Sequence, residues 1–182
     1  MFIELVKRMK MRYLFFIFLL FFLIFAQEKN DSLKSYKKAP SFSLYNLNKE
    51  KVYLDSLLNK GPIFISFWAL WCKLCIQELD AFKKVYEKYE TLGLKVLAIS
   101  EDGPRAINNV KTFVKGKKWR YEILLDTDGK VRELFGVGSI MPTSFILDKK
   151  GNIRLISRGY RKGDEKKFIK VIEELINEDK KD

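Results

Sequence analysis

Two short, predominantly apolar segments, Ile63–Trp68 and Leu94–Ile99, each precede a segment in which apolar residues recur at helical spacing. Apolar runs of this length are typical of strands that are buried on both faces of a sheet. Because strands that alternate with helices pair through crossover connections, the pattern predicts an α/β fold with a central mixed sheet and helices on both faces. The expected strands are Ser41–Leu44 and Lys51–Leu54 (an N-terminal β-hairpin), Ile63–Trp68, Leu94–Ile99, Tyr121–Leu125, Thr143–Leu147 and Ile153–Ser157, and the expected helices are Cys72–Tyr89, Arg105–Lys115, Lys130–Phe135 and Glu165–Asn177, the last capped by Asp164.

The chain has 182 residues, a length that favours one globular domain after an N-terminal targeting segment. Its start is basic and leads into the uncharged run Tyr13–Ala26. As a helix this run would rise about 21 Å, less than the ~30 Å of a bilayer core. That is typical of a secretory signal peptide, with an uncleaved membrane anchor as the alternative. We therefore expect residues 1–26 to direct export, 27–38 to form a polar tether, and 39–182 to form a domain that works outside the cytoplasm, in the periplasm or at the outer face of the cytoplasmic membrane.

Composition excludes several kinds of chemistry. The chain has no histidine, two cysteines and a formal net charge of +12. Without histidine it cannot form a Ser-His-Asp or Cys-His nucleophile pair or a histidine-containing zinc site, and two thiols do not complete a structural zinc site. We therefore expect no resident metal. Basic residues are interspersed with acids rather than gathered in one stripe, which disfavours nucleic-acid binding.

The two cysteines, Cys72 and Cys75, lie three residues apart where the first buried strand gives way to a helix. At that spacing the side chains reach each other across one helical turn, so a disulfide forms and breaks with little backbone movement. Unpaired N–H groups at a helix start, together with the neighbouring Lys73, favour a thiolate at Cys72. We therefore expect Cys72 to attack a substrate disulfide and Cys75 to resolve the mixed disulfide. A structural disulfide and a Cu(I) site on the two thiolates are the alternatives.

Two separated segments carry a resemblance to a known family. They are FISFWALWCKLCIQEL (Phe64–Leu79) and FGVGSIMPTSFILDKKGNI (Phe135–Ile153). With both, the chain resembles the thioredoxin superfamily over residues 39–177, and more closely the exported TlpA/ResA/CcmG branch of thiol-disulfide oxidoreductases. The resemblance implies a thioredoxin-like three-layer sandwich and no cofactor beyond the redox-active Cys72–Cys75 disulfide. Peroxiredoxins share much of this fold, but the Pro-x-x-x-Thr-x-x-Cys context of their nucleophile is missing here.

The resemblance also implies a surface that binds substrate. Pro142 matches the cis-proline that faces the disulfide in this superfamily, and the backbone of Met141 then pairs with an extended substrate. Trp71 matches an aromatic residue that forms a platform beside the sulfur atoms. Taken without the resemblance, a trans bend at Pro142 and ordinary partial burial of Trp71 are the plainer expectations.

Glu78 matches a glutamate that the ResA-like branch carries three residues beyond the second cysteine. Helix geometry places Glu78 one turn from Cys75, where a buried carboxyl can relay the proton of the resolving thiol. The alternative is an exposed acid in an early helical turn, where the helix dipole favours it. Ser66 stands where thioredoxins carry a buried aspartate, which leaves Glu78 as the better candidate for moving the proton.

Together these features predict an exported enzyme that reduces protein disulfides. The Lys-Leu dipeptide between the cysteines departs from the Gly-Pro of thioredoxin and the Glu-Pro common in ResA-like members, so the reduction potential does not follow from the motif. The family implies a membrane thiol carrier of the DsbD or CcdA kind as electron donor, and apocytochrome c among the substrates. The alternatives are an oxidant or isomerase of secreted proteins, a Cu(I)-binding protein, and a scaffold whose cysteine pair stays oxidised.

Overall fold

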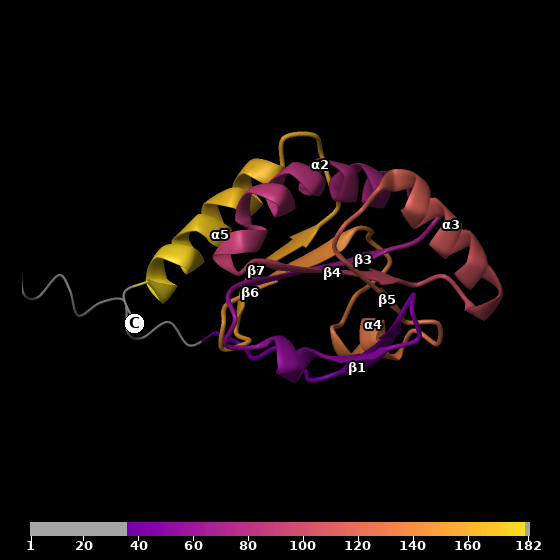
Figure 1. Ribbon diagram of the computed structural model, residues 1–182, viewed down its shortest axis with the longest axis horizontal. Coiled ribbons are helices and arrows are strands. Elements are labelled where there is room, and N and C mark those ends of the chain that lie inside the picture. Colours follow the sequence, from indigo (N-terminus) through magenta and orange to yellow (C-terminus); the bar gives the residue numbers. More distant parts are fainter. Residues whose placement is uncertain (1–35, 181–182) are drawn as a thin grey trace, which may run out of the picture. The chain divides into compact units, whose positions relative to one another are not determined.

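The computed structural model describes residues 36–180, in which seven strands form one sheet with the order β2-β1-β5-β4-β3-β6-β7 (Figure 1). Strands β3, β4 and β5 are mutually parallel, whereas β6, β7, β1 and β2 join antiparallel. The expected mixed sheet is thus confirmed. The elements are β1 (Ser43–Asn46), β2 (Lys51–Tyr53), η2 (Leu54–Leu57), β3 (Ile63–Trp68), α2 (Lys73–Tyr89), η3 (Glu90–Leu92), β4 (Lys95–Ser100), η4 (Pro104–Ala106), α3 (Ile107–Lys117), β5 (Glu122–Leu125), α4 (Lys130–Leu134), β6 (Thr143–Leu147), β7 (Ile153–Arg158) and α5 (Glu165–Asp179).

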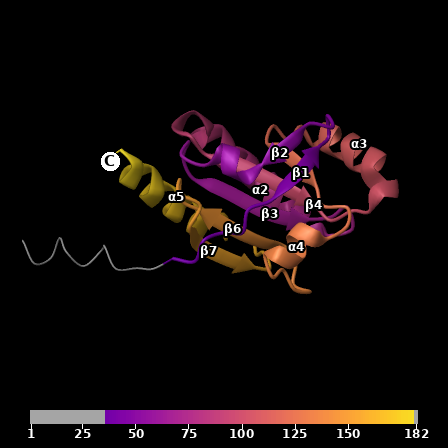
Figure 2. The ribbon, with the colours of Figure 1, turned by 90° about the horizontal axis from the view of Figure 1, so that it is seen from below.

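The central strand β3 shows how the two faces of the sheet are used. Every residue of β3 is buried, and successive side chains alternate between the faces. Phe64 and Trp68 pack in a cluster with α2, α3 and α5, while Ile65 and Phe67 pack in a second cluster with α4 and the N-terminal segment. Helices α2, α3 and α5 accordingly lie on one face, and Figure 2 views the face that carries α4. This arrangement is the expected three-layer sandwich.

The first two strands extend the sheet on the side of β5. Strand β1 pairs antiparallel with β2 and with β5, and it extends to Asn46, two residues beyond the expected strand end at Leu44, so the turn to β2 begins later than expected. The Asn46 side chain closes that turn by accepting the N–H groups of Asn48 and Glu50. Pairing with the rest of the domain already begins at Lys37, whose carbonyl accepts the Ile153 N–H. The described chain therefore joins the sheet two residues before the expected domain start.

The start of α5 differs from the sequence-based expectation. Asp164 occupies the N-cap position, but its side chain makes no capping hydrogen bond to the helix. Its carboxylate instead accepts the backbone N–H of Arg161, in the turn that precedes the helix. The predicted cap is wrong because Asp164 has a helical backbone conformation, φ −64° and ψ −20°, rather than the extended one that directs a capping side chain back to the helix.

Residues 1–26, which the sequence predicts to direct export, lie outside the described residues, as does most of the predicted tether at 27–38. Between residues 36 and 180, no helix has both the length and the apolar character that crossing a membrane requires.

Candidate active site

The cysteine pair lies at the junction of β3 and α2. Cys72 is the N-cap of α2, its Sγ accepts the Cys75 N–H at 3.2 Å, and its own N–H donates to the Ala69 carbonyl. The two residues form a disulfide with their Cα atoms 5.3 Å apart. Cys72 retains 7% exposure, whereas Cys75 has none. The cysteine at the helix start is thus the more accessible of the two, and the second lies buried one turn along.

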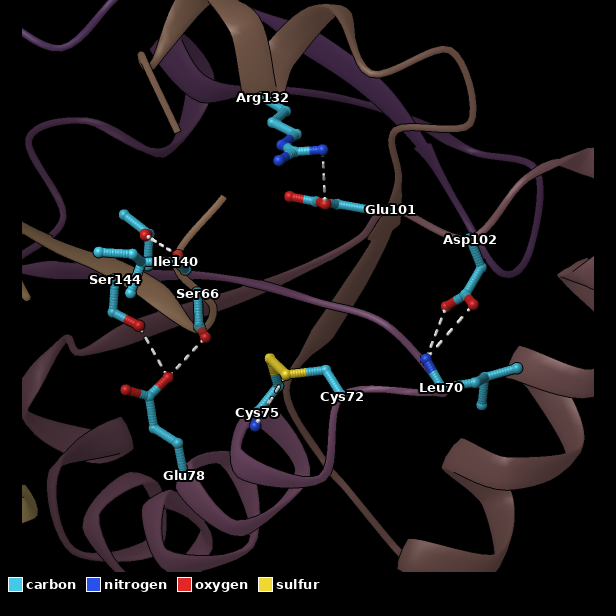
Figure 3. Close-up of a disulfide and its surroundings, with 11 residues drawn as sticks. Ser66, Leu70, Cys72, Cys75, Glu78, Glu101, Asp102, Arg132, Ile140 and Ser144 are labelled. Atoms are coloured by element: carbon cyan, nitrogen blue, oxygen red, sulfur yellow. Dashed lines mark hydrogen bonds and ion pairs between the residues drawn. A yellow bond between two sulfur atoms is a disulfide. The ribbon is translucent and has the colours of Figure 1, made fainter. Parts of the chain in front are cut away.

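Glu78 is buried beneath α2, against the sheet. The side chains of Ser66 and Ser144 both donate to its Oε2 at 2.7 Å, and Oε1 has no hydrogen-bond partner among residues 36–180. Figure 3 shows the carboxyl directed at the two serines, with the disulfide alongside. Burial raises the pKa of Glu78 to about 7, and the two serine hydrogen bonds act in the opposite direction. Of the two environments expected for Glu78, the structure shows the buried one.

The register of the sheet explains this contact. Ser66 and Ser144 are directly opposite each other in the antiparallel pair β3–β6. Ser66 shares the α2 side of β3 with Phe64 and Trp68, because side chains alternate along a strand. Two small polar side chains thus stand side by side where larger residues would fill the space, and Glu78 enters that space from the helix above.

The loop before β6 reaches the same edge of the sheet. Its Met141–Pro142 peptide bond is cis, as the resemblance implies. Since Thr143 pairs with Phe67, Pro142 comes opposite the end of β3, close in space to the start of the cysteine motif. The side chain of Met141 packs against the cluster that contains both cysteines. Trp71 is 72% exposed, so burial in the core does not account for an aromatic residue at this position.

Two acidic residues that the sequence analysis did not single out lie at this edge as well. Asp102 and Glu101 follow β4; the Asp102 carboxylate accepts the N–H of Leu70, two residues before Cys72, and the Glu101 carboxylate pairs with Arg132 of α4 (Figure 3). One signal in the sequence pointed to them. The carboxyl ends of neighbouring parallel strands meet at one edge of a sheet, so residues directly after Leu94–Ile99 had to lie near the cysteine motif.

Metal ligands are sparse in the described structure. Among residues 36–180, no three cysteine, aspartate or glutamate side chains gather in a way that would hold an ion. The soft ligands at the site are the thioether of Met141 and the sulfur atoms of Cys72 and Cys75, and the two cysteine sulfurs are bonded to each other here.

A disulfide at the first turn of a helix, beside a cis-proline loop in a sheet of this order, defines the thioredoxin-like class of proteins. The chain belongs to the AhpC/TSA family, whose model matches residues 36–156. The names of its curated relatives are more specific than the name of this family. The thiol-disulfide oxidoreductase ResA of Bacillus thuringiensis subsp. konkukian is 32% identical over 125 residues, which cover 69% of this chain and 70% of that protein.

Two further comparisons agree. ResA of Bacillus subtilis is 28% identical over 130 residues, or 71% of this chain and 70% of that protein. The crystal structure of a candidate thiol:disulfide interchange protein DsbE from Chlorobium tepidum has a TM-score of 0.72 and 28% identity, over 80% of this chain and 99% of that one. The protein is therefore a thiol-disulfide oxidoreductase of the ResA/DsbE kind.

Proposed function

We propose that this protein reduces disulfides in other proteins outside the cytoplasm, with Cys72 as the attacking residue. The observation that carries the proposal is the pairing of a cysteine that keeps 7% exposure at a helix start with a buried, protonatable carboxyl one turn beyond its fully buried partner. A protein in which the disulfide is purely structural needs neither feature.

The first step is attack on the substrate. The Cys72 thiolate, favoured by the N-terminal dipole of α2, attacks one sulfur of a substrate disulfide. A mixed disulfide forms, and the other substrate sulfur leaves as a thiolate. The backbone before Pro142 and the exposed ring of Trp71 supply the surface on which an extended substrate segment binds.

The second step releases the product. Cys75 loses its proton and attacks the Cys72 sulfur, which expels the second substrate thiolate and leaves the Cys72–Cys75 disulfide. The substrate gains two electrons and the enzyme loses two. Glu78 is the proton acceptor for Cys75 in this scheme. With a pKa of about 7, a share of its carboxyls is ionised near neutral pH and able to take that proton.

Burial supports the reducing direction. Cys75 has no exposure and lies in an apolar cluster, and the Glu78 carboxyl lies one helical turn away. Both features disfavour a charged thiolate at Cys75. A dithiol that gains little from thiolate stabilisation gives up its electrons more readily than one whose reduced form is strongly stabilised.

The partners follow from this direction. An enzyme that reduces disulfides in an oxidising compartment must itself be re-reduced, which calls for a membrane thiol carrier of the DsbD or CcdA kind. The apolar run at Tyr13–Ala26 supports export or anchoring of the domain. Apocytochrome c, with its paired thiols, is the substrate class that the ResA resemblance suggests.

The reduction potential tests the direction. The full chain, purified in mild detergent, is equilibrated in thiol–disulfide buffers, and the oxidised fraction is read by alkylation. We expect a potential near or below about −250 mV, from which electrons flow to most oxidised substrates. A value near about −120 mV would overturn the reductase assignment in favour of an oxidant. A pair that no such buffer reduces would instead support a structural disulfide.

Trapping tests the substrates. Cys75→Ser cannot resolve the mixed disulfide, so it should accumulate covalent complexes with its clients in cells, while the matched variant Cys72→Ser should accumulate few. Exported proteins with paired cysteines among the trapped partners support the proposal. Equal trapping by both variants would contradict the assignment of Cys72 as the attacking residue.

A further inference from the structure

Asp102 forms hydrogen bonds to the segment that precedes the cysteine motif. The β3–β4 ladder ends where the Glu101 N–H donates to the Trp68 carbonyl. The next donor on the β3 side, the Leu70 N–H, has no backbone acceptor among residues 36–180. It donates instead to the Asp102 carboxylate, at 3.1 Å to Oδ2 and 3.3 Å to Oδ1. The Asp102 side chain thus takes the place of a backbone acceptor and continues the β3–β4 hydrogen bonding to Leu70, two positions before Cys72.

The Asp102 carboxylate is itself held in place. It is buried, and its Oδ2 accepts the Ser100 hydroxyl at 2.8 Å, while the Asp102 N–H donates back to the same hydroxyl oxygen. These reciprocal bonds fix the acid to the end of β4. The Leu70 N–H is consequently held by a rigid element of the sheet.

Glu101 acts toward the other side of the site. Its side chain, 6% exposed, forms an ion pair with Arg132, in which Nη1 lies 3.4 Å from Oε2. The second arm of that guanidinium donates to the Gly138 carbonyl at 2.7 Å. Gly138 belongs to the loop that leads to Met141–Pro142. The Glu101 Oε1 has no hydrogen-bond partner within residues 36–180, so Arg132 is the one described cation or donor that its side chain engages.

We propose that Glu101 and Asp102, together with Arg132, are positioning residues for disulfide exchange, and we call these three residues the clamp. Asp102 holds the segment that leads to Cys72, and Glu101, through Arg132, holds the loop that leads to Pro142. Two adjacent residues at the end of one central strand thereby set the distance between the attacking sulfur and the backbone that binds the substrate. The inference rests on the attacking role of Cys72 in the proposed function, but not on the direction of electron flow.

The physical reason is the narrow geometry of exchange. Attack on a disulfide requires the three sulfur atoms to be brought into alignment, and a misplacement of 1 Å at a reacting centre costs about 10²-fold in rate. Neither loop is part of a helix or strand, so each needs an external anchor to stay in register with the other. Both anchors arise from the end of β4, which is hydrogen-bonded to β3 and β5.

The test is a single-turnover reaction of pre-reduced full-length protein with excess oxidised dicysteine peptide. Because exchange is followed from reduced enzyme, its rate does not depend on the direction used in cells. We expect Asp102→Ala to lower the maximal rate about 10²-fold. Asp102→Asn keeps an oxygen that accepts the Leu70 N–H, so it should stay within about threefold of wild type. Arg132→Gln should raise the half-saturating peptide concentration about tenfold with little change in maximal rate.

Two further variants keep the test decisive. Ser100→Ala removes the hydroxyl that holds the Asp102 carboxylate but keeps the carboxylate, and it should lower the exchange rate about tenfold. This variant replaces Asp102→Ala in the test if Asp102→Ala does not fold. Asp128→Asn is the matched control, because Asp128 is an exposed acid that pairs with Lys130 and contacts neither loop. It should react like wild type.

The outcomes separate positioning from stability and from charge. Variants that lose stability but react at the wild-type rate once folded would overturn the proposal. If Asp102→Asn and Asp102→Ala lower the exchange rate equally, and shift the pH dependence of Cys72 alkylation equally, the effect is one of charge. That result would also overturn the proposal. A potential near −120 mV for wild type would end the reductase proposal while leaving this inference standing, because the clamp acts on either direction of exchange.

Discussion

Glu78 shows at the residue scale how one buried carboxyl links stability to chemistry. Its exposed fraction is 1%, and its two donors are neutral hydroxyls rather than a cation. A carboxylate in such a place loses solvation that hydroxyls only partly replace, so its protonated form is favoured. The same raised pKa that suits a proton acceptor for Cys75 therefore makes the folded protein sensitive to pH.

We expect Glu78→Gln to remove a pH dependence of folding. The folded-state pKa of about 7 exceeds the ordinary value of 4.5. Between these values the folded state retains a proton that the unfolded state has released, so the free energy of unfolding falls as pH rises. For wild type this fall should be on the order of 3 kcal/mol and complete above about pH 7. Urea unfolding of the oxidised proteins at pH 4.5, 6 and 8 measures the difference between the two. Parallel curves for the two proteins would show that Glu78 titrates normally.

At the element scale, α2 concentrates the chemistry in its first two turns. Its N-cap is Cys72, its next turn carries Cys75 and then Glu78, and it packs on the centre of the sheet. Lys73 is exposed in the first turn, where a basic residue opposes the helix dipole. Its position next to Cys72 offers a reason for that unfavourable placement, because a positive charge there stabilises the thiolate.

Lys73→Glu should therefore make the protein a stronger reductant. A negative charge beside Cys72 disfavours the thiolate, raises the pKa of that thiol and destabilises the reduced form, so the potential should fall by roughly 10–30 mV. Lys84→Glu, further along the same helix, makes the same change in net charge away from the disulfide and should leave the potential unchanged. Equilibration of both variants in the same redox buffers gives the comparison. Equal shifts would mean that net charge, and not proximity, sets the effect.

At the scale of the whole molecule, aromatic packing ties the site to the rest of the fold. Phe64 of β3 stacks on Phe82 of α2 with ring centroids 3.8 Å apart, and Phe168 of α5 packs edge-on against both. The three rings join the strand before the motif, the helix that carries it and the C-terminal helix. The position of the active-site helix thus depends on a helix formed at the far end of the sequence.

We expect Phe168→Ala to cost about 3–5 kcal/mol of unfolding free energy, because the ring is buried and the cavity it leaves is enclosed on several sides. Leu134→Ala, at a side chain that is 59% exposed, should cost less than about 0.5 kcal/mol and serves as the control. Urea unfolding of the oxidised proteins at pH 7 measures both. Similar small losses for the two variants would show that α5 contributes little to holding the domain together.

Much of this architecture could be predicted from local patterns. The limits of β3 and β6 coincide with the expected strands, and the helix after the cysteine motif begins one residue later than expected. Such elements carry their information locally, in apolar runs and helical spacing. The weaker predictions were at turns, as with Asn46 and Asp164, because a short polar side chain there has several backbone partners within reach.

The sequence by itself determined the order of strands and helices, the cysteine pair at a helix start and the family to which the chain belongs. Only the tertiary structure decided whether Glu78 is buried, because helical spacing assigns a residue to a face but not to what lies beneath that face. It also decided that Ser66 and Ser144 meet under that carboxyl, that Asp102 reaches the segment before Cys72, and that Glu101 is linked to the loop before Pro142 through Arg132. The physical reason is common to all of these contacts: each joins residues of different elements, and the packing of those elements on one another, rather than any local pattern, brings the residues together.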